Sequence, residues 1–292
     1  MAFEEYDGKI EDLVAYEQIS GHLIFDVKLS ENFQRKVRFV ADGHLVETPD
    51  SVTYSTVVYR DSVRILLLEA ALNGLEVKGD DVQNAFLSAN NLEKHWLRAG
   101  PKFGPEQGKV FIVVRALYGL KSASASFRAF MARKLDEIGL KSSSDDPDVW
   151  LRPAVKFNGE EYYEWVLMYV DDILAISMDP TAIFKSMEGD TVKYKNGKIE
   201  PPEMYLGAKL QEKEINEYSC WTIPSADYIK AAVHTVKDSV NKGKCQWKLP
   251  SKAPTSMVSS FVPELDGTPE LGPDDHRFFQ EMIGMLILHR GF

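Results

Sequence analysis

Residues 165–177, WVLMYVDDILAIS, decide the fold that we expect for this chain. Two short apolar runs, rich in β-branched residues, flank the adjacent acids Asp171 and Asp172. Each run is too short for a convincing helix and its composition favours strand, so the sequence predicts a β-hairpin with the acids at its tip. Two neighbouring carboxylates repel each other unless a cation lies between them. The stretch therefore indicates a site for a hard, oxygen-seeking metal ion.

The alternative is an exposed acidic turn. Asp-Asp is a poor choice for a tight hairpin turn, which prefers Asn-Gly or Asp-Gly. The four-residue pattern aromatic-x-Asp-Asp nevertheless occurs by chance in about one chain in twenty of this length. The metal-site hypothesis therefore needs a third acid and a surface that binds a substrate.

Length and composition restrict the class of protein. The 292 residues allow one large domain or two smaller ones. The acidic first 20 residues do not resemble a signal peptide, and no apolar run approaches the roughly 20 residues that span a bilayer. Two cysteines, Cys220 and Cys245, provide neither a disulfide framework nor a multi-cysteine zinc cluster. We therefore expect an intracellular protein without a membrane segment.

The charge is distributed unevenly. A net charge of −10 argues against a protein that coats nucleic acid over its whole surface. Residues 109–135, however, contain six basic residues and no acid. This stretch is either the solvated basic face of a helix or a local surface for phosphate groups.

The predicted elements alternate between helix and strand. Two strands are predicted within residues 21–46, and another at 110–114. Helices are predicted at 61–73, with Asp61 or Ser62 as the cap and Gly74 as the stop, and at about 122–138. Further helices are predicted after Ser225 and in the apolar segment 278–288, with a loop before the latter. This alternation predicts an α+β or mixed-sheet protein.

The third acid is predicted to be Asp81. It ends the apolar strand of the segment LEVKGDDVQNAFL, residues 75–87, where an antiparallel neighbour can bring the hairpin tip beside it. Three carboxylates there would hold two magnesium ions that keep water ligands and bind substrate phosphates. Such a site suits in-line displacement at phosphorus, which is nucleotidyl transfer.

Several blocks carry a resemblance to a known family. They are similar, in order and spacing, to the reverse transcriptase of copia-type long-terminal-repeat retrotransposons, over roughly residues 20–290. The blocks are KVRFVADGH at 36–44, SVTYSTVVYRDSVRILLLEAALNGLEV at 51–77, DVQNAFL at 81–87, VRALYGLKS at 114–122, DPDVW at 146–150, YVDDIL at 169–174 and YLGA at 205–208.

The resemblance implies a right-hand polymerase fold with fingers, palm and a partial thumb. Its implied boundaries are an N-terminal segment at 1–20, fingers at 21–75 and 92–122, palm at 76–91 and 123–212, and a truncated partial thumb or connection at 213–292. The implied partners are an RNA template, a DNA primer and deoxynucleoside triphosphates, and the implied cofactor is Mg²⁺, as two ions.

The resemblance also implies residue roles. The catalytic and metal-binding residues are Asp81, Asp171 and Asp172, whereas Asp80 occupies a position that is usually apolar in the family. The nucleotide-binding residues are Lys36, Arg38, Phe86, Tyr118, Gly119 and Lys121, with Phe86 beneath the incoming sugar. The primer and template residues are Tyr169, Val170, Tyr205, Leu206 and Gly207. Each residue that is not an acid also has an alternative as an ordinary packing residue.

The chain departs from the family in two places. Many relatives have Gln-Ala-Pro where this chain has Ser122, Ala123 and Ser124, which puts the nucleotide contacts there in doubt. The chain also ends inside an apolar helical pattern, whereas family polyproteins continue into an RNase H domain. We therefore expect a C-terminally truncated fragment, located in cytoplasmic virus-like particles or the nucleus. It is either an RNA-directed DNA polymerase or an inactive remnant that at most binds nucleic acid.

Overall fold

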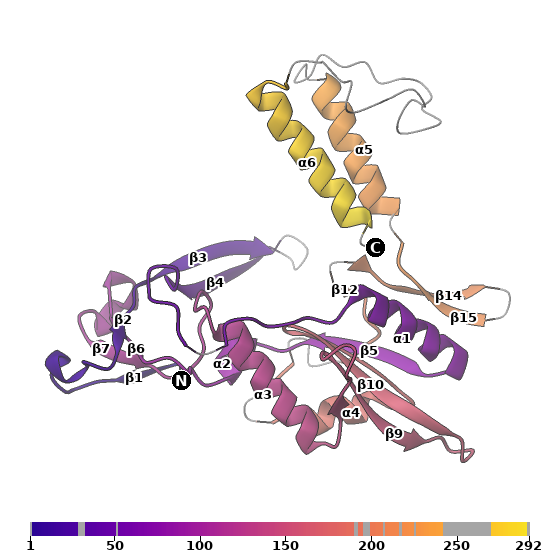
Figure 1. The fold of residues 1–292 in the computed structure, drawn as a ribbon, viewed down its shortest axis with the longest axis horizontal. Helices are drawn as coiled ribbons and strands as arrows, with labels where there is room; N and C mark the ends of the chain where they lie inside the picture. The colour runs from indigo at the N-terminus through magenta and orange to yellow at the C-terminus, as the bar shows by residue number, and fades with distance from the viewer. Residues whose placement is uncertain are drawn as a thin grey trace. The chain divides into compact units, whose positions relative to one another are not determined.

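Five antiparallel strands form the sheet that carries the predicted hairpin (Figure 1). Their order is β5 (Glu76–Asp81), β11 (Asp172–Ser177), β10 (Glu161–Tyr169), β9 (Val149–Val155) and β8 (Lys141–Ser142). This computed structural model describes residues 2–28, 33–50, 52–189, 192–194, 199–206, 208–215, 218–224, 226–241 and 270–290. The β10–β11 hairpin predicted from residues 165–177 is confirmed.

Helices cover both faces of this sheet. Ile173 and Ala175 of β11 belong to the core cluster that also holds buried residues of α3 (Ala123–Glu137) and α4 (Pro180–Met187). Leu174 and Ile176 are fully buried but lie outside that cluster. Because successive strand residues point to opposite faces, these two face the other side, where α1 contacts β5 and β11.

Helix α1 (Arg60–Asn73) shows how its neighbours set its ends. Gly74 adopts the left-handed conformation, with φ of 61°, and ends the helix as predicted. The predicted cap is wrong, because Tyr59 holds the N-cap position and no side chain caps it. The Ser62 hydroxyl instead donates to Oδ2 of Asp146, 84 residues away, and Asp61 pairs with Arg64.

A second sheet has the strand order β1-β7-β6-β2. Its strands are β1 (Phe3–Glu5), β7 (Val110–Val113), β6 (His95–Arg98) and β2 (Glu17–Gln18). The 3-10 turns η1 (Ile10–Asp12) and η2 (Pro101–Glu106) and the short helix α2 (Ala85–Ser88) fill the connections. The predicted strands in residues 21–46 form a separate hairpin, β3 (Gly21–Lys28) with β4 (Gln34–Ala41).

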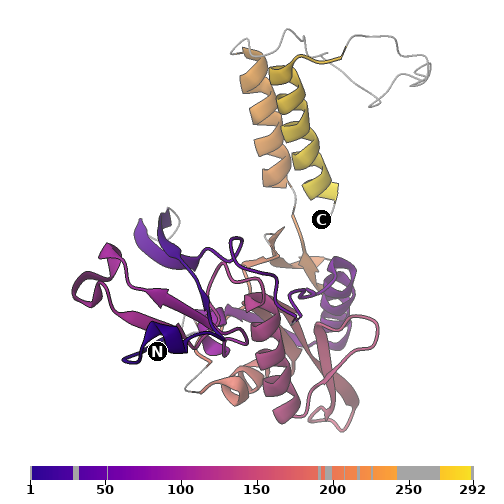
Figure 2. The same cartoon turned by 60° about the vertical axis from the view of Figure 1, so that its left-hand side comes forward.

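Aromatic rings join the β3–β4 hairpin to this second sheet. Phe39 of β4 packs edge-on against Phe3 of β1, with ring centroids 5.8 Å apart, and against Phe103, at 5.6 Å. Phe111 of β7 completes the cluster by stacking on Phe103. In Figure 1 and Figure 2 the hairpin and the four-stranded sheet lie together at one end of this part of the molecule.

The chain divides into two compact units. The first comprises Met1–Leu206 and Glu214–Trp221, and holds everything described so far. The second comprises Gly207–Lys213 and Thr222–Phe292, in which α5 (Ala226–Asn241) packs against α6 (Pro273–Arg290). The short strands β12 (Met204–Tyr205), β13 (Ala208–Lys209), β14 (Gln211–Ile215) and β15 (Tyr218–Thr222) lie where the chain passes between the units.

The mixture of sheets and separate helices confirms the α+β class. The loop predicted before the last helix falls largely outside the described residues. In the part of the chain that the structure describes, no helix combines the length and the apolar character needed to cross a membrane.

Candidate active site

The hairpin tip presents the two predicted acids in different ways. Tyr169, the last residue of β10, pairs with Asp172, the first residue of β11, so Val170 and Asp171 form the two-residue loop. Val170 has a φ of 54°, a conformation that β-branched residues rarely adopt. The strands on both sides of the loop must therefore hold this backbone in place.

The third acid meets the tip through strand pairing. Strand β5 pairs with β11 so that Asp81 lies directly opposite Asp172. The amide of Val82 donates to the carbonyl oxygen of Asp171 at 2.8 Å. Directly opposite residues in an antiparallel ladder have Cα atoms about 4.5 to 5.5 Å apart and point to the same face. Asp81 and Asp172, which are 91 positions apart in the sequence, are thus neighbours.

Asp80 lies beside Asp81 but points to the opposite face, as strand alternation requires. It is buried, with 6% of its surface exposed, and its Oδ1 accepts a hydrogen bond from the Asp81 amide at 2.7 Å. The negative charge of Asp80 contributes to the raised pKa of Tyr194, after burial and Glu188. The two adjacent acids therefore have different surroundings, and only Asp81 shares a face with Asp172.

The donor chemistry of Asp81, Asp171 and Asp172 suits a hard divalent ion, because Mg²⁺ prefers carboxylate oxygens. Among the described residues, no group of three or more His, Cys, Asp or Glu side chains is already arranged to hold a metal ion. The strand pairing fixes the backbones, whereas the carboxylate oxygens move by rotation about the side-chain torsions. The backbone therefore fits such a site, and the side chains would have to turn to complete it.

Three predicted nucleotide-binding residues form a stack. The Arg38 guanidinium lies over the Tyr118 ring at 5.7 Å from its centroid. The Phe86 ring lies 4.7 Å from that of Tyr118, centroid to centroid, and packs edge-on against Phe127 at 6.2 Å. Burial raises the pKa of Tyr118 and the charge of Asp171 raises it further, so the stack lies within electrostatic reach of the hairpin tip.

Gly119 and Lys121 anchor the turn that carries Tyr118. Gly119 has a φ of 91°, and a Cβ atom there would lie 2.0 Å from the carbonyl oxygen of Ala41. The Ala41 amide donates to the Tyr118 carbonyl at 2.7 Å. The Lys121 ammonium donates to the carbonyl of Val46, at 2.8 Å, and to the Thr48 hydroxyl, at 3.1 Å. These contacts are structural, and a nucleotide contact by Lys121 stays a prediction.

The remaining predicted residues occupy varied positions. Lys36 is half-buried in β4, opposite Asp26 and on the same face as Arg38. Tyr205 is buried, and its hydroxyl donates to the Leu167 carbonyl at 3.2 Å. Burial raises the pKa of Tyr205 well above its usual value, and the charge of Asp172 adds to the effect. Leu206 has a φ of 55°, and Gly207 lies outside the described residues.

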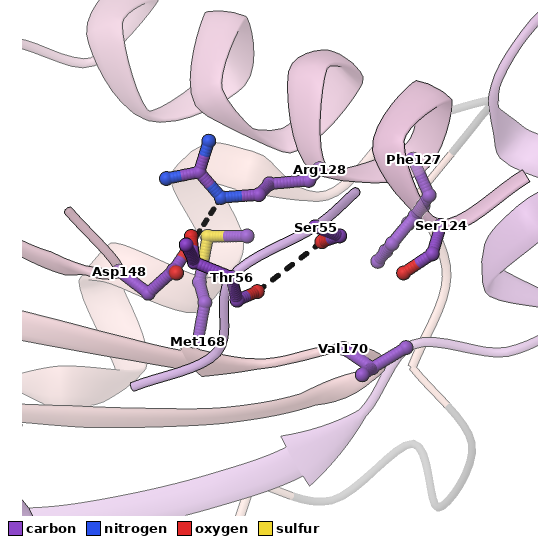
Figure 3. Close-up of a pocket in the computed structure, with 8 residues that line it drawn as sticks. All are labelled: Ser55, Thr56, Ser124, Phe127, Arg128, Asp148, Met168 and Val170. Atoms are coloured by element: carbon purple, nitrogen blue, oxygen red, sulfur yellow. Dashed lines mark hydrogen bonds and ion pairs between the residues drawn. The ribbon is translucent and has the colours of Figure 1, made fainter. Parts of the chain in front are cut away.

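The sequence reasoning missed a polar network behind the hairpin. Arg128 of α3 pairs with Asp148 at 2.6 Å, and the two residues line a small pocket together with Val170 (Figure 3). Asp146 and Asp148 stand in the block DPDVW, which the sequence analysis used only for the family resemblance and gave no residue roles. The available signal was the pair of acids directly before the apolar strand β9, since buried acids need partners.

Comparison with known proteins decides the family. A sequence model of the family described as reverse transcriptase (RNA-dependent DNA polymerase) matches residues 15–246, more than three quarters of the chain. The chain belongs to this reverse transcriptase family. The resemblance predicted from its motifs is therefore confirmed.

Two curated relatives of this reverse transcriptase chain come from plant transposons. The retrovirus-related Pol polyprotein from transposon TNT 1-94 of Nicotiana tabacum is 33% identical over 164 residues, which are 54% of this chain. The corresponding polyprotein from transposon RE1 of Arabidopsis thaliana is 27% identical over 181 residues, or 60% of this chain. In each case the match spans 12% of the relative's length.

Proposed function

We propose that this chain is the RNA-directed DNA polymerase domain of a copia-type retrotransposon polyprotein and extends a DNA primer on an RNA template. The pairing of Asp81 with Asp172, next to Asp171, is the observation that carries this proposal. It brings together acids from two distant family motifs at one strand end.

The three carboxylates would hold two divalent ions, which we take to be Mg²⁺. Bound there, the ions would activate the primer 3′-hydroxyl and neutralise charge on the leaving pyrophosphate. Arg38, held on Tyr118, and Lys36 on the same strand face would bind the triphosphate, because cationic side chains form strong charge-assisted bonds to phosphate. Phe86, which packs against Tyr118, would exclude a 2′-hydroxyl from the incoming sugar.

The same proposal extends to the domains and partners. Residues 21–75 and 92–122 would be the fingers, 76–91 and 123–212 the palm, and 213–292 a partial thumb. Tyr169, Val170, Tyr205, Leu206 and Gly207 would lie along the primer and template. Deoxynucleoside triphosphates would be the second substrate.

A primer-extension assay on an RNA template tests the proposal. Wild-type protein should incorporate deoxynucleotides only with a divalent ion, and Asp171→Asn should abolish incorporation. Asp145→Asn is the matched control, because Asp145 is an exposed acid of the same unit outside the hairpin. Equal incorporation by wild type and Asp171→Asn would refute the role of the hairpin acids.

The second candidate function is that of a folded remnant that binds nucleic acid without turnover. A folded wild-type protein that gives no incorporation, and whose melting temperature does not rise with Mg²⁺ and deoxynucleotide, would support it, because a ligand that binds the native state stabilises that state.

A further inference from the structure

Strand β10, which leads into the hairpin tip, forms hydrogen bonds at Met168 with residues that are not part of its strand ladders. Met168 lies three residues before Asp171. The Met168 amide donates to the Asp148 carbonyl at 3.0 Å, and the Met168 carbonyl accepts from the Val58 amide at 3.2 Å. The ladder between β10 and β9 ends one residue earlier, at Leu167 and Val149. The hydrogen bonds with Asp148 and Val58 therefore fix β10 beyond the end of the ladder, up to the strained loop.

Asp148 is itself a buried carboxylate that forms an ion pair with the partly exposed Arg128. Only 1% of the surface of Asp148 is exposed, and its Oδ1 accepts from Nε of Arg128 at 2.6 Å. Nη2 of the same guanidinium donates to the Pro147 carbonyl at 3.1 Å. The other carboxylate oxygen, Oδ2, is buried and has no hydrogen-bond partner in the part of the chain that the structure describes. A buried charge is costly without a counter-ion, so Arg128 dictates where Asp148 lies.

Asp146 ties the same loop to helix α1. Its Oδ1 accepts from the Asp148 amide at 3.2 Å, and its Oδ2 accepts from the Tyr59 amide at 2.8 Å and the Ser62 hydroxyl at 2.6 Å. A carboxylate at a helix N-terminus also interacts favourably with the helix dipole. The loop thus joins α1, α3 and β10 behind the hairpin.

The close-up in Figure 3 shows how this network faces the hairpin tip. Arg128, Asp148, Met168, Thr56 and Val170 all line this pocket, and in the close-up Val170 is drawn apart from the Arg128–Asp148 pair. A shift of the ion pair would be transmitted through Met168 to Val170, whose φ of 54° requires a rigid surround.

We propose that Asp148 and Arg128 are positioning residues for Asp171 and Asp172. The inference rests on the proposed polymerase function, because the two residues would keep the hairpin loop in the position in which Asp171 and Asp172 can both face Asp81. Neither residue has to touch substrate. They act through the Asp148 carbonyl on the Met168 amide.

Steady-state primer extension tests the positioning role with Asp148→Asn, Arg128→Ala and Arg128→Lys. Asp148→Asn and Arg128→Ala should lower kcat at least tenfold and raise the Mg²⁺ concentration for half-maximal rate several-fold. The KM for primer–template should change less than twofold, and Arg128→Lys should recover part of the loss. Variants that melt earlier but keep the wild-type kcat and Mg²⁺ dependence would overturn the proposal.

Lys134→Ala is the matched control. Lys134 lies on the same helix as Arg128 and forms an exposed ion pair with Glu137, so it reports the loss of a cation without the loss of the network. It should behave as wild type in every measurement. A kcat lowered equally by Lys134→Ala and Arg128→Ala would contradict a specific role for Arg128.

Hydrogen–deuterium exchange separates this inference from the polymerase proposal, since it needs no activity. The peptide covering residues 165–173 should exchange at least several-fold faster in Asp148→Asn than in wild type, and at the wild-type rate in Lys134→Ala. Unchanged exchange in Asp148→Asn would overturn the positioning role even in an active enzyme. Faster exchange in a protein without incorporation would uphold it while the polymerase proposal fails.

Discussion

Replacing Gly119 by alanine should disturb the nucleotide site through the backbone alone. Gly119 follows Tyr118, whose ring packs against both Arg38 and Phe86. An alanine Cβ would lie 2.0 Å from the carbonyl oxygen of Ala41, a backbone atom that cannot rotate away. The end of β4 would have to move, and with it the bond between the Ala41 amide and the Tyr118 carbonyl.

The expected loss in the free energy of unfolding is the sum of two contributions. A non-glycine residue at positive φ costs about 1 to 2 kcal/mol, and relief of a close contact in a packed region costs roughly 1 to 3 kcal/mol more. Gly119→Ala should therefore lower the free energy of unfolding by about 2 to 5 kcal/mol. Gly74→Ala supplies the control, because Gly74 has a φ of 61° but no atom within 4 Å of its added Cβ. It should lose only the first contribution, about 1 to 2 kcal/mol.

Urea unfolding of the two variants, followed by tryptophan fluorescence, measures this difference. Nucleotide KM in primer extension should rise in Gly119→Ala and stay at the wild-type value in Gly74→Ala. Equal loss of stability in both variants would show that the contact with Ala41 relaxes without cost. An unchanged nucleotide KM in Gly119→Ala would separate the Tyr118 turn from nucleotide binding.

Three further predictions concern neighbouring side chains. Phe86→Ala should lower discrimination against ribonucleotides by at least tenfold while reducing deoxynucleotide incorporation less. If competition assays show that incorporation of ribonucleotides and of deoxynucleotides falls equally, the assignment of Phe86 is rejected. Arg38→Ala and Lys36→Ala should each raise the nucleotide KM about tenfold with primer–template affinity unchanged, and an unaltered nucleotide KM would rule out triphosphate contacts. Tyr205→Phe should cost about 1 kcal/mol at pH 7, since it removes the bond to the Leu167 carbonyl. Because the pKa of Tyr205 is raised in the folded protein, the unfolded chain releases this proton first as the pH rises above about 10, and the free energy of unfolding of the wild type declines there. The free energy of unfolding of Tyr205→Phe should decline less over the same pH range.

The sequence was sufficient to predict the hairpin and its partner strand, because both depend on local pattern. Apolar β-branched runs around Asp171 and Asp172 have few structural solutions, and Asp81 ends a short segment in which the apolar Leu75 and Val77 alternate with polar residues. The helix at 60–73 was also predictable from its apolar stripe and from Gly74, which needs no Cβ at a left-handed position. Fold class and the meeting of the acids followed from these patterns together with the family motifs.

The network behind the tip was not predictable in the same way, because its contacts join residues far apart in sequence through irregular backbone. Ser62 was expected to cap its own helix, yet its hydroxyl is bound by Asp146, whose position depends on how the loop before β9 folds. The ammonium of Lys121 likewise donates to the carbonyl of Val46, a contact that its motif did not indicate, and its nucleotide contact stays a prediction. The hydroxyl of Ser62 was interpreted from its place at the helix start, whereas a half-buried polar group takes the nearest acceptor or donor that the tertiary structure offers.

Asp80 and Asp81 also differ in burial, and this difference cannot be predicted from residue type. Both are acids in one strand, and only the register with β11 places Asp81 opposite Asp172 while Asp80 pairs with Ile173. A register shift of one residue would exchange the two faces and place Asp80 opposite Asp172. The residues that fix this register, the buried apolar side chains of β5 and β11, therefore matter for the site as much as the acids do. By the same reasoning, the Val82 amide on the Asp171 carbonyl is the contact that connects the strand register to the loop.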